Sequence, residues 1–328
     1  MTYLILGSNS FSGSSFINYV LNNTNSKIVA VSRSNEYDKS LLTYKNNKEY
    51  FRVDFYEFDL NKNLDEIVSI IADNKIECII NFAAQGMVAQ SWNNPSEWFN
   101  TNVLSLVALL DKIYKFDFIK KFVQISTPEV YGECNNIKET MNFAPSTPYA
   151  SSKASADLVL YTYYKTHGFP VNFTRASNVY GPYQQLYRII PKTILSIRKG
   201  IKLPLHGGGK AIRSFIHIDD VAKATFVIAN EAKSGNIYHL SDNKTISIYD
   251  LVKIISEELN VQIKDYVEIT SDRIGTDALY LMNNEKIYDE FGFTPKIKFR
   301  DGIKSVVDWV DDNFEKLINY PDYYIHKK

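Results

Sequence analysis

The sequence is poor in cysteine, carries no net charge and has no long apolar run. Its two cysteines, Cys78 and Cys134, show neither metal-ligand spacing nor a disulfide framework, which favours a reducing compartment. Lysine plus arginine and aspartate plus glutamate each number 37, so the charge gives no reason to expect nucleic acid or an anionic membrane as a partner. No apolar run approaches about 18 residues, and no basic segment with a cleavage site follows Met1. We therefore expect a cytoplasmic protein that is neither secreted nor membrane-spanning.

What the sequence does contain is an alternation of short apolar runs and helical apolar stripes. Its 328 residues, 45% hydrophobic and 23% charged, suffice for about two domains with buried cores. This alternation predicts an α/β fold with a parallel sheet. Strands are predicted at residues 3–6, 27–31, 51–58, 77–82 and 122–125, and a long helix at 95–116.

The first predicted strand leads into a glycine-rich turn, Gly7-Ser8-Asn9-Ser10-Phe11-Ser12-Gly13, and then into a helical pattern. Glycine lets the backbone turn sharply or approach a pyrophosphate, and a helix amino terminus offers oriented N–H groups. A strand, turn and helix in this order predict a dinucleotide-binding unit. The residues of the turn predicted to contact the cofactor are Gly7, Ser10, Phe11 and Gly13.

The second predicted strand ends in Ser32-Arg33-Ser34, where enzymes that use NAD usually carry a carboxylate for the ribose hydroxyls. A guanidinium beside two hydroxyls suits a 2′-phosphate. Ser32 and Arg33 are therefore predicted to bind an NAD(P) cofactor, and the sequence favours NADP. The alternative, that Arg33 is a solvated loop cation, stays open. Residues 35–50 are predicted to form a surface loop.

The fourth predicted strand precedes Asn81-Phe82-Ala83-Ala84-Gln85, whose small residues would let the backbone approach the cofactor. A packing contact between strand and helix would require the same alanines, so both interpretations stay open. Ala83, Ala84 and Gln85 are candidate cofactor residues.

The motifs that carry the chemistry lie in the middle of the chain. Thr127 and Glu129 follow a predicted buried strand at its carboxyl end, where ligands of open α/β sheets bind, and in an extended segment their side chains face the same way. Pro148 is predicted to begin a helix on which Tyr149 and Lys153 lie four residues apart. An ammonium near a phenol favours the phenolate, which a general base for a hydroxyl needs. The predicted catalytic residues are Thr127, Glu129, Tyr149 and Lys153.

Over nearly its whole length the chain resembles the extended short-chain dehydrogenase/reductases, and within them the nucleotide-sugar 4,6-dehydratases. The resemblance rests on motifs in the family's order: the glycine turn, residues 81–85, Thr-x-Glu, Tyr-x-x-x-Lys, and residues 177–184, 213–215 and 272–277. One departure is Ser10, where the family has glycine.

The resemblance implies a Rossmann-like doubly wound parallel sheet with a smaller C-terminal α/β lobe that binds the substrate. It assigns residues 1–176 plus 213–233 to the NAD(P)-binding domain, with a strand and a helix at 213–233 that return to the sheet. Residues 177–212 plus 234–328 form the nucleotide-sugar lobe, which begins with a predicted loop at 175–187.

The resemblance also implies further contacts. Asp59 and Leu60 are expected against the adenine, and Tyr149 and Lys153 beside the nicotinamide. A homodimer is expected through the 95–116 helix and the Tyr149 helix, and the alternative, that the chain's own loops bury this apolar surface, stays open. Arginine matches diphosphate oxygens in geometry, so the nucleotide-sugar site should contain it. The implied substrate residues are Asn178, Arg188, Leu203, His206, Arg213 and Arg273. No histidine or cysteine spacing predicts a metal site.

The implied activity is that of an NDP-hexose 4,6-dehydratase, a lyase that recycles its NAD(P) internally. Tyr149 takes the C4 hydroxyl proton, Glu129 removes the C5 proton, and water leaves C6. Thr127 would hydrogen-bond the C4 oxygen. Pro128 stands where many dTDP-sugar dehydratases have an acidic aspartate, so Glu129 is expected to act as the acid too. GDP-mannose dehydratases also lack that aspartate, and the base and the hexose stay open.

Three alternatives share parts of this pattern. An NDP-sugar C4-epimerase needs Tyr149 and Lys153 but no base at Glu129. A UDP-glucuronate decarboxylase often keeps Thr-x-Glu but usually has a charged run after the tyrosine, where this chain has Ala150-Ser151-Ser152. A cofactor-binding sensor without catalysis typically loses the tyrosine or the lysine, and both are present.

Overall fold

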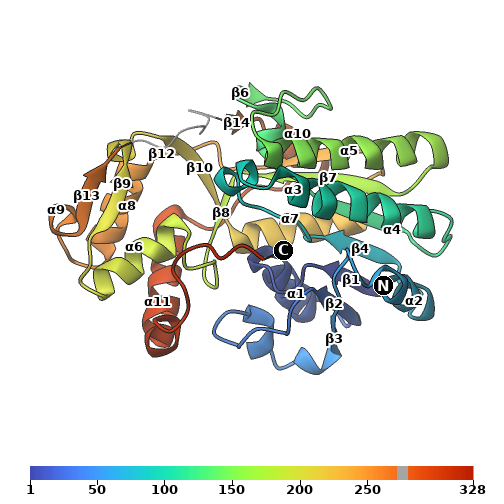
Figure 1. The fold of residues 1–328 in the computed structure, drawn as a ribbon, viewed down its shortest axis with the longest axis horizontal. Coiled ribbons are helices and arrows are strands. Elements are labelled where there is room, and N and C mark those ends of the chain that lie inside the picture. Colours follow the sequence, from blue (N-terminus) through green and yellow to red (C-terminus); the bar gives the residue numbers. More distant parts are fainter. Residues whose placement is uncertain (272–279, 328) are drawn as a thin grey trace.

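The computed structural model describes residues 1–271 and 280–327 of the protein. Its main feature is a seven-stranded sheet in the order β11-β7-β5-β4-β1-β2-β3, in which every neighbouring pair is parallel. The predicted Rossmann-like α/β fold is therefore confirmed (Figure 1). The strands are β1 (Tyr3–Leu6), β2 (Ile28–Ser32), β3 (Val53–Glu57), β4 (Cys78–Asn81), β5 (Lys121–Ile125), β7 (Val171–Ala176) and β11 (Ile237–Leu240).

Both faces of this sheet are covered, because alternate strand residues enter different apolar cores. Along β1, Tyr3 and Ile5 belong to one core, and Leu4 and Leu6 belong to the other. Helices α1 (Phe11–Asn23) and α7 (Ile218–Glu231) cover the first face. The second face is covered by α2 (Leu64–Asp73), α4 (Ser105–Ile113) and α5 (Pro148–His167).

The long helix predicted at 95–116 is present but not regular. It consists of α3 (Pro95–Phe99), a π-helical turn (Asn100–Leu104) and α4. Single π-helical turns inside α-helices occur frequently at functional sites. This turn buries Asn102, whose side chain contributes to the site described below.

A second lobe packs around its own apolar core, at the left of Figure 1. That core joins Ile194 and Leu251 to Val306 and Trp309. The helices of the lobe are α6 (Ile189–Arg198), α8 (Ile248–Glu258), α9 (Ile263–Tyr266) and α11 (Phe299–Leu317). Its strands are β8 (Asn178–Tyr180), β9 (Leu203–His206), β10 (Ile212–His217), β12 (Thr245–Ser247) and β13 (Val267–Thr270). A separate two-stranded sheet joins β6 (Cys134–Ile137) and β14 (Tyr280–Met282), and α10 (Glu285–Phe291) packs against β11 of the large sheet.

Two local expectations for the carboxyl-terminal half are wrong. The strand at 213–217 does not return to the large sheet: β10 pairs with β8 and β12, whereas β11 completes the large sheet. The loop predicted at 175–187 begins later, since β7 runs through Ala176 and β8 follows. The domain boundaries as a whole stay a prediction.

The surface loop predicted at 35–50 is also wrong in part. Leu42 and Tyr44 are fully buried, and Thr43–Asn46 forms a 3₁₀ turn. The Trp309 indole N–H of α11 donates to the Ser40 carbonyl at 3.1 Å. This segment therefore joins the two lobes. Among the helices of the described ranges, none combines the length and apolar character that crossing a membrane needs.

Candidate active site

The glycine turn after β1 packs closely against the end of β4. Gly7 has φ +85°, and a Cβ atom there would lie 2.8 Å from the Ala83 amide nitrogen. A Cβ atom on Gly13 would lie 2.6 Å from the Gly7 carbonyl oxygen. Both positions therefore require glycine. Ala83 also packs against an apolar core of the sheet, whereas Ala84 is exposed.

Ser10 tolerates the loss of the family's glycine because its backbone is not in the left-handed region. Its φ is −73°, it caps the amino terminus of α1, and its Oγ accepts from the Gly13 N–H at 3.0 Å. Phe11 is buried and begins the helix. The turn keeps its shape, and the amino terminus of α1 is placed at the predicted cofactor position.

Because β1, β2 and β3 are parallel, the carboxyl ends of β2 and β3 lie at the same edge of the sheet as the glycine turn. Ser32 is buried and Arg33 is half-buried. Asn9 joins the turn to the loop after β2, because its Nδ2 donates to the Ser34 carbonyl at 3.0 Å. Asp59 and Leu60 are half-buried after β3, where the Asp59 carboxylate accepts from the Asn61 N–H at 2.9 Å.

Asn102 joins the end of β4 to helix α5, and it was not anticipated from the sequence. Its Oδ1 accepts from the Gln85 N–H at 2.8 Å. Its Nδ2 donates to the Gln85 carbonyl at 3.1 Å and to Ser152 Oγ at 2.9 Å. The buried amide thus fixes Gln85 relative to the helix that carries Tyr149 and Lys153.

Thr127 and Glu129 are held by a 3₁₀ turn, so the extended segment predicted for them is wrong. Thr127 is the extended residue before Pro128–Tyr131, and its Oγ1 accepts from the Glu129 N–H at 3.3 Å. Thr127 is buried and Glu129 is half-buried. The cap, with proline at the first position of the turn, fixes both residues at the carboxyl end of β5.

Helix α5 begins where the sequence predicts. Thr147 Oγ1 accepts from the Ala150 N–H at 3.2 Å, Pro148 occupies the first helical position, and the helix ends at Gly168 in the left-handed conformation. Tyr149 and Lys153 therefore lie on one face of its first turns. The Tyr149 N–H donates to Ser91 Oγ at 3.2 Å.

Lys153 is buried at the junction of α5 and β5. Its Nζ donates to the Ile125 carbonyl at 2.7 Å, and only 3% of the residue is exposed. Burial lowers the pKa of Lys153 from 10.5 to about 8, and the charge of Asp157 opposes that shift. The ammonium thus lies one helical turn from Tyr149 on the same helix.

A buried polar network lies behind these residues. Asp157 and Arg175 are both fully buried and form an ion pair at 2.9 Å. Asp157 also accepts from Ser126 Oγ at 2.6 Å. The other end of the Arg175 guanidinium donates to the Tyr131 hydroxyl, and Tyr131 is the last residue of the 3₁₀ turn that holds Glu129. The network joins α5 to that turn.

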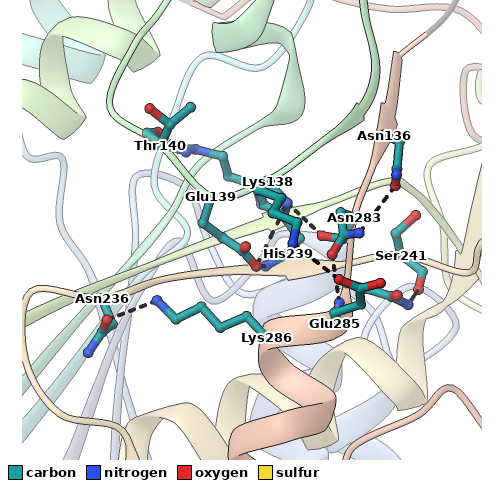
Figure 2. Close-up of polar contacts among 12 residues, drawn as sticks. Asn136, Lys138, Glu139, Thr140, Asn236, His239, Ser241, Asn283, Glu285 and Lys286 are labelled. Atoms are coloured by element: carbon teal, nitrogen blue, oxygen red, sulfur yellow. Dashed lines mark hydrogen bonds and ion pairs between the residues drawn. The ribbon is translucent and has the colours of Figure 1, made fainter.

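His239 of β11 extends the network in one defined tautomer. Its Nδ1 hydrogen-bonds to the Asn283 carbonyl at 2.9 Å, and since a carbonyl only accepts, Nδ1 carries the proton. Nε2 then accepts from the Tyr131 hydroxyl at 2.8 Å. Burial lowers the pKa of His239 to about 3, which keeps it neutral. Figure 2 shows Glu139 beside it, accepting from the His239 backbone N–H at 3.2 Å.

The predicted substrate residues lie in the second lobe or at its start. Arg188 is exposed before α6, with its guanidinium 5.6 Å from the centre of the Tyr187 ring. Asn178 Nδ2 donates to the Ser214 carbonyl at 3.1 Å, which places it next to Arg213 of β10. His206 shares a hydrogen bond of 2.9 Å with Thr270.

For two of the predicted substrate residues, the structure gives no side chain that could face a substrate. Leu203 is 2% exposed and packs with Leu205 and Val252, so its side chain belongs to the core of the lobe. Arg273 lies outside the described residues.

Within residues 1–271 and 280–327, no three His, Cys, Asp or Glu side chains gather in a way that could hold a metal ion.

Comparison with known proteins gives one consistent result. The family model described as GDP-mannose 4,6 dehydratase matches residues 4–306. The chain is 31% identical to dTDP-glucose 4,6-dehydratase 1 of Escherichia coli strain K12, over 97% of this chain and 95% of that protein.

Two solved structures are also similar. A dTDP-glucose 4,6-dehydratase from Bacillus anthracis in complex with NAD has a TM-score of 0.86 at 32% identity and covers 96% of this chain and 98% of its own. A dTDP-glucose 4,6-dehydratase from Streptomyces venezuelae with NAD and TYD bound has a TM-score of 0.88 at 28% identity, with the same coverage.

Proposed function

The chain belongs to the GDP-mannose 4,6-dehydratase family of the extended short-chain dehydrogenase/reductases and is a nucleotide-sugar 4,6-dehydratase, and from this premise we propose the role of each residue. The observation that carries the proposal is the convergence of two elements at the carboxyl end of β5. The capped 3₁₀ turn brings Thr127 and Glu129, and the first turns of α5 bring Tyr149 and Lys153.

Tyr149 acts as the base that takes the proton of the C4 hydroxyl. The Lys153 ammonium lies one helical turn away and favours the phenolate. Thr127 hydrogen-bonds the C4 oxygen. When bound, the nicotinamide accepts the hydride from C4 and returns it to C6, so NAD(P) is regenerated without leaving.

Glu129 acts in the elimination step, in which the sugar loses its C5 proton and its C6 hydroxyl. A ketone at C4 acidifies the C5 hydrogen, Glu129 takes that proton, and the C6 hydroxyl leaves as water. Because Pro128 offers no acid, the protonated Glu129 gives its proton to the leaving hydroxyl. As the hydride returns to C6, C5 takes up a proton from solvent, and Tyr149 releases the C4 hydroxyl proton to solvent. The net change is the loss of one water, which is a lyase reaction.

The substrate is a hexose linked to a nucleoside diphosphate, and we propose Arg188 and Arg213 as ligands of its diphosphate. Both come from the second lobe, which lies beyond the carboxyl edge of the sheet. The relatives named above act on dTDP-glucose or hold TYD, which supports a deoxythymidine nucleotide as the first substrate to test. A panel of dTDP-, GDP-, UDP- and CDP-hexoses identifies the base.

The cofactor is NAD(P). Two observations favour different members of this pair: the similar dehydratase structures hold NAD, whereas Arg33 suits the 2′-phosphate of NADP. The preference for NADP stays a prediction. A cytoplasmic location also stays a prediction, which rests on the free thiols of Cys78 and Cys134.

The test of this function is Glu129→Gln in deuterated water. The wild-type product should acquire deuterium at C5, because that proton exchanges with solvent, whereas the hydrogen arriving at C6 comes from C4. Glu129→Gln should still oxidise C4 but eliminate water about 10² to 10⁴ times more slowly, so a 4-keto sugar accumulates. Elimination by the variant at the wild-type rate would remove Glu129 from the mechanism, whereas a wild-type product that has lost no water and carries no C5 deuterium would favour the epimerase alternative.

A further inference from the structure

Residues 320–327, here called the strap, leave α11 of the second lobe and lie against the large domain (Figure 1). The strap shows a two-residue periodicity although it belongs to no sheet. Asp322, Tyr324 and His326 are half-buried, and Tyr323 and Ile325 between them are 62% and 51% exposed. An extended segment with alternate residues buried is docked on a surface, because an unattached segment would expose both sets.

The inward residues of the strap are anchored at both ends. In the second lobe, Lys199, the residue that follows α6, pairs with Asp322 at 3.0 Å. In the large domain, the His326 ring stacks on Trp98 of α3, with ring centres 5.1 Å apart and planes 5° from parallel. His326 Nε2 also hydrogen-bonds to the carboxylate of Glu97.

The last described residue of the strap contacts two loops of the cofactor side. Gln85 Nε2 donates to the Lys327 carbonyl at 2.8 Å, and Lys327 Nζ donates to the Tyr37 hydroxyl at 3.2 Å. Gln85 follows β4 and Tyr37 follows β2. In the sheet order β4-β1-β2, the strand between them is β1, which leads into the glycine turn. Lys327 therefore joins the two loops that flank that turn.

The position of the strap bears on how a dinucleotide enters and leaves its site. A dinucleotide in this fold lies along the carboxyl ends of β4, β1 and β2, with its pyrophosphate at the glycine turn. A segment that joins the loops after β4 and β2 lies across that position. We propose that the strap is part of the cofactor site: it closes the groove over the dinucleotide and has to release before the dinucleotide can leave.

The proposal rests on the dehydratase function, and it agrees with the chemistry of that function. A cofactor that receives a hydride and returns it to the same substrate needs no exchange between turnovers. A strap that slows exchange therefore costs no catalytic rate, whereas a dehydrogenase that releases a reduced cofactor after each cycle would be slowed by it.

The experiment measures the dissociation rate of NADH from the holoenzyme by rapid mixing with excess NAD. His326→Ala removes the stack on Trp98 and the hydrogen bond to Glu97, and deletion of residues 321–328 removes the strap. Each should raise the dissociation rate about tenfold or more, as expected from the loss of a ring stack and a charge-assisted hydrogen bond. Tyr323→Ala, at an outward position of the same segment, is the matched control and should stay within about twofold of wild type.

Two further measurements separate the possible failures. Thermal unfolding of the cofactor-free variants shows whether a faster release only reflects a damaged fold, and His326→Ala should unfold near the wild-type temperature. Dissociation rates unchanged in both strap variants, with water loss from the sugar intact, would overturn the strap and leave the dehydratase function standing. A wild-type protein that binds no dinucleotide would overturn both.

Discussion

At the scale of single residues, we expect Lys153 to determine the pH range in which Tyr149, the proposed base, is effective. Burial lowers the pKa of Lys153 from 10.5 to about 8, so the ammonium that favours the Tyr149 phenolate is lost as pH rises through 8. We expect kcat to fall above about pH 8. Tyr149→Phe, with no base to support, should retain about 10⁻² to 10⁻⁴ of the rate at every pH.

The stability of the fold should change in the opposite direction over the same window. Between pH 8 and 10.5 the unfolded chain binds the Lys153 proton and the native state does not, so this group's contribution to the free energy of unfolding rises with pH. Loss of activity by titration of Lys153 is thus distinguishable from loss by unfolding. A rate that stays level across this window would exclude Lys153 as the titrating group.

Arg33 gives a prediction about cofactor choice. If its guanidinium binds a 2′-phosphate, Arg33→Ala should weaken NADP binding by about 1.5 to 3 kcal/mol and leave NAD binding nearly unchanged. Dissociation constants for both cofactors, measured by calorimetry on both proteins, check this. Equal losses for NAD and NADP, or a wild-type preference for NAD, would contradict the NADP assignment.

At the scale of elements, Tyr131 couples the turn that holds Glu129 to helix α5. Tyr131→Phe would remove one acceptor of the buried Arg175 guanidinium, which keeps Asp157 and the Thr140 carbonyl, and would leave His239 Nε2 without its hydroxyl donor. We expect the free energy of unfolding to fall by about 1 to 3 kcal/mol, and kcat to fall more than KM rises, because the turn loses its fixed position. Urea unfolding and steady-state kinetics measure both. The control is Tyr323→Phe, at a residue 62% exposed, and a Tyr131→Phe variant that matches it would show that the network is dispensable.

The elements that the sequence predicts correctly have local signals. Helix α5 has Thr147 and Pro148 at its start and Gly168 at its end, and the turn after β1 has its glycines where the backbone approaches itself. The residues that were missed act across long sequence separations. Asn102 reaches α5 from a π-helical turn, and Arg175 reaches Tyr131 from β7, so only the topology of the sheet reveals them.

At the scale of the whole molecule, the sheet was predictable and the connections between the lobes were not. Parallel strands buried on both faces are apolar runs that can be read directly from the sequence. Residues 35–50 read as polar, yet Leu42 and Tyr44 are buried in the tertiary structure. The strap gives no sequence signal either, because its alternation is short and its partners, Gln85, Trp98 and Lys199, are distant in the chain.

Self-association is the remaining prediction at this scale. Leu104 is 60% exposed and Leu158 is 46% exposed, and they lie on neighbouring elements, the π-helical turn before α4 and helix α5. Large apolar side chains exposed on neighbouring elements indicate an interface, which here would pair this turn and α5 with their copies around a two-fold axis. We expect sedimentation equilibrium to give a homodimer for the wild-type chain and a monomer for Leu104→Glu/Leu158→Glu, because four carboxylates cannot be buried in one apolar contact.

Ile269→Glu in β13 is the matched control, since Ile269 is 72% exposed on the other lobe. A dimer that survives the double substitution, or one that Ile269→Glu dissociates, would place the interface elsewhere.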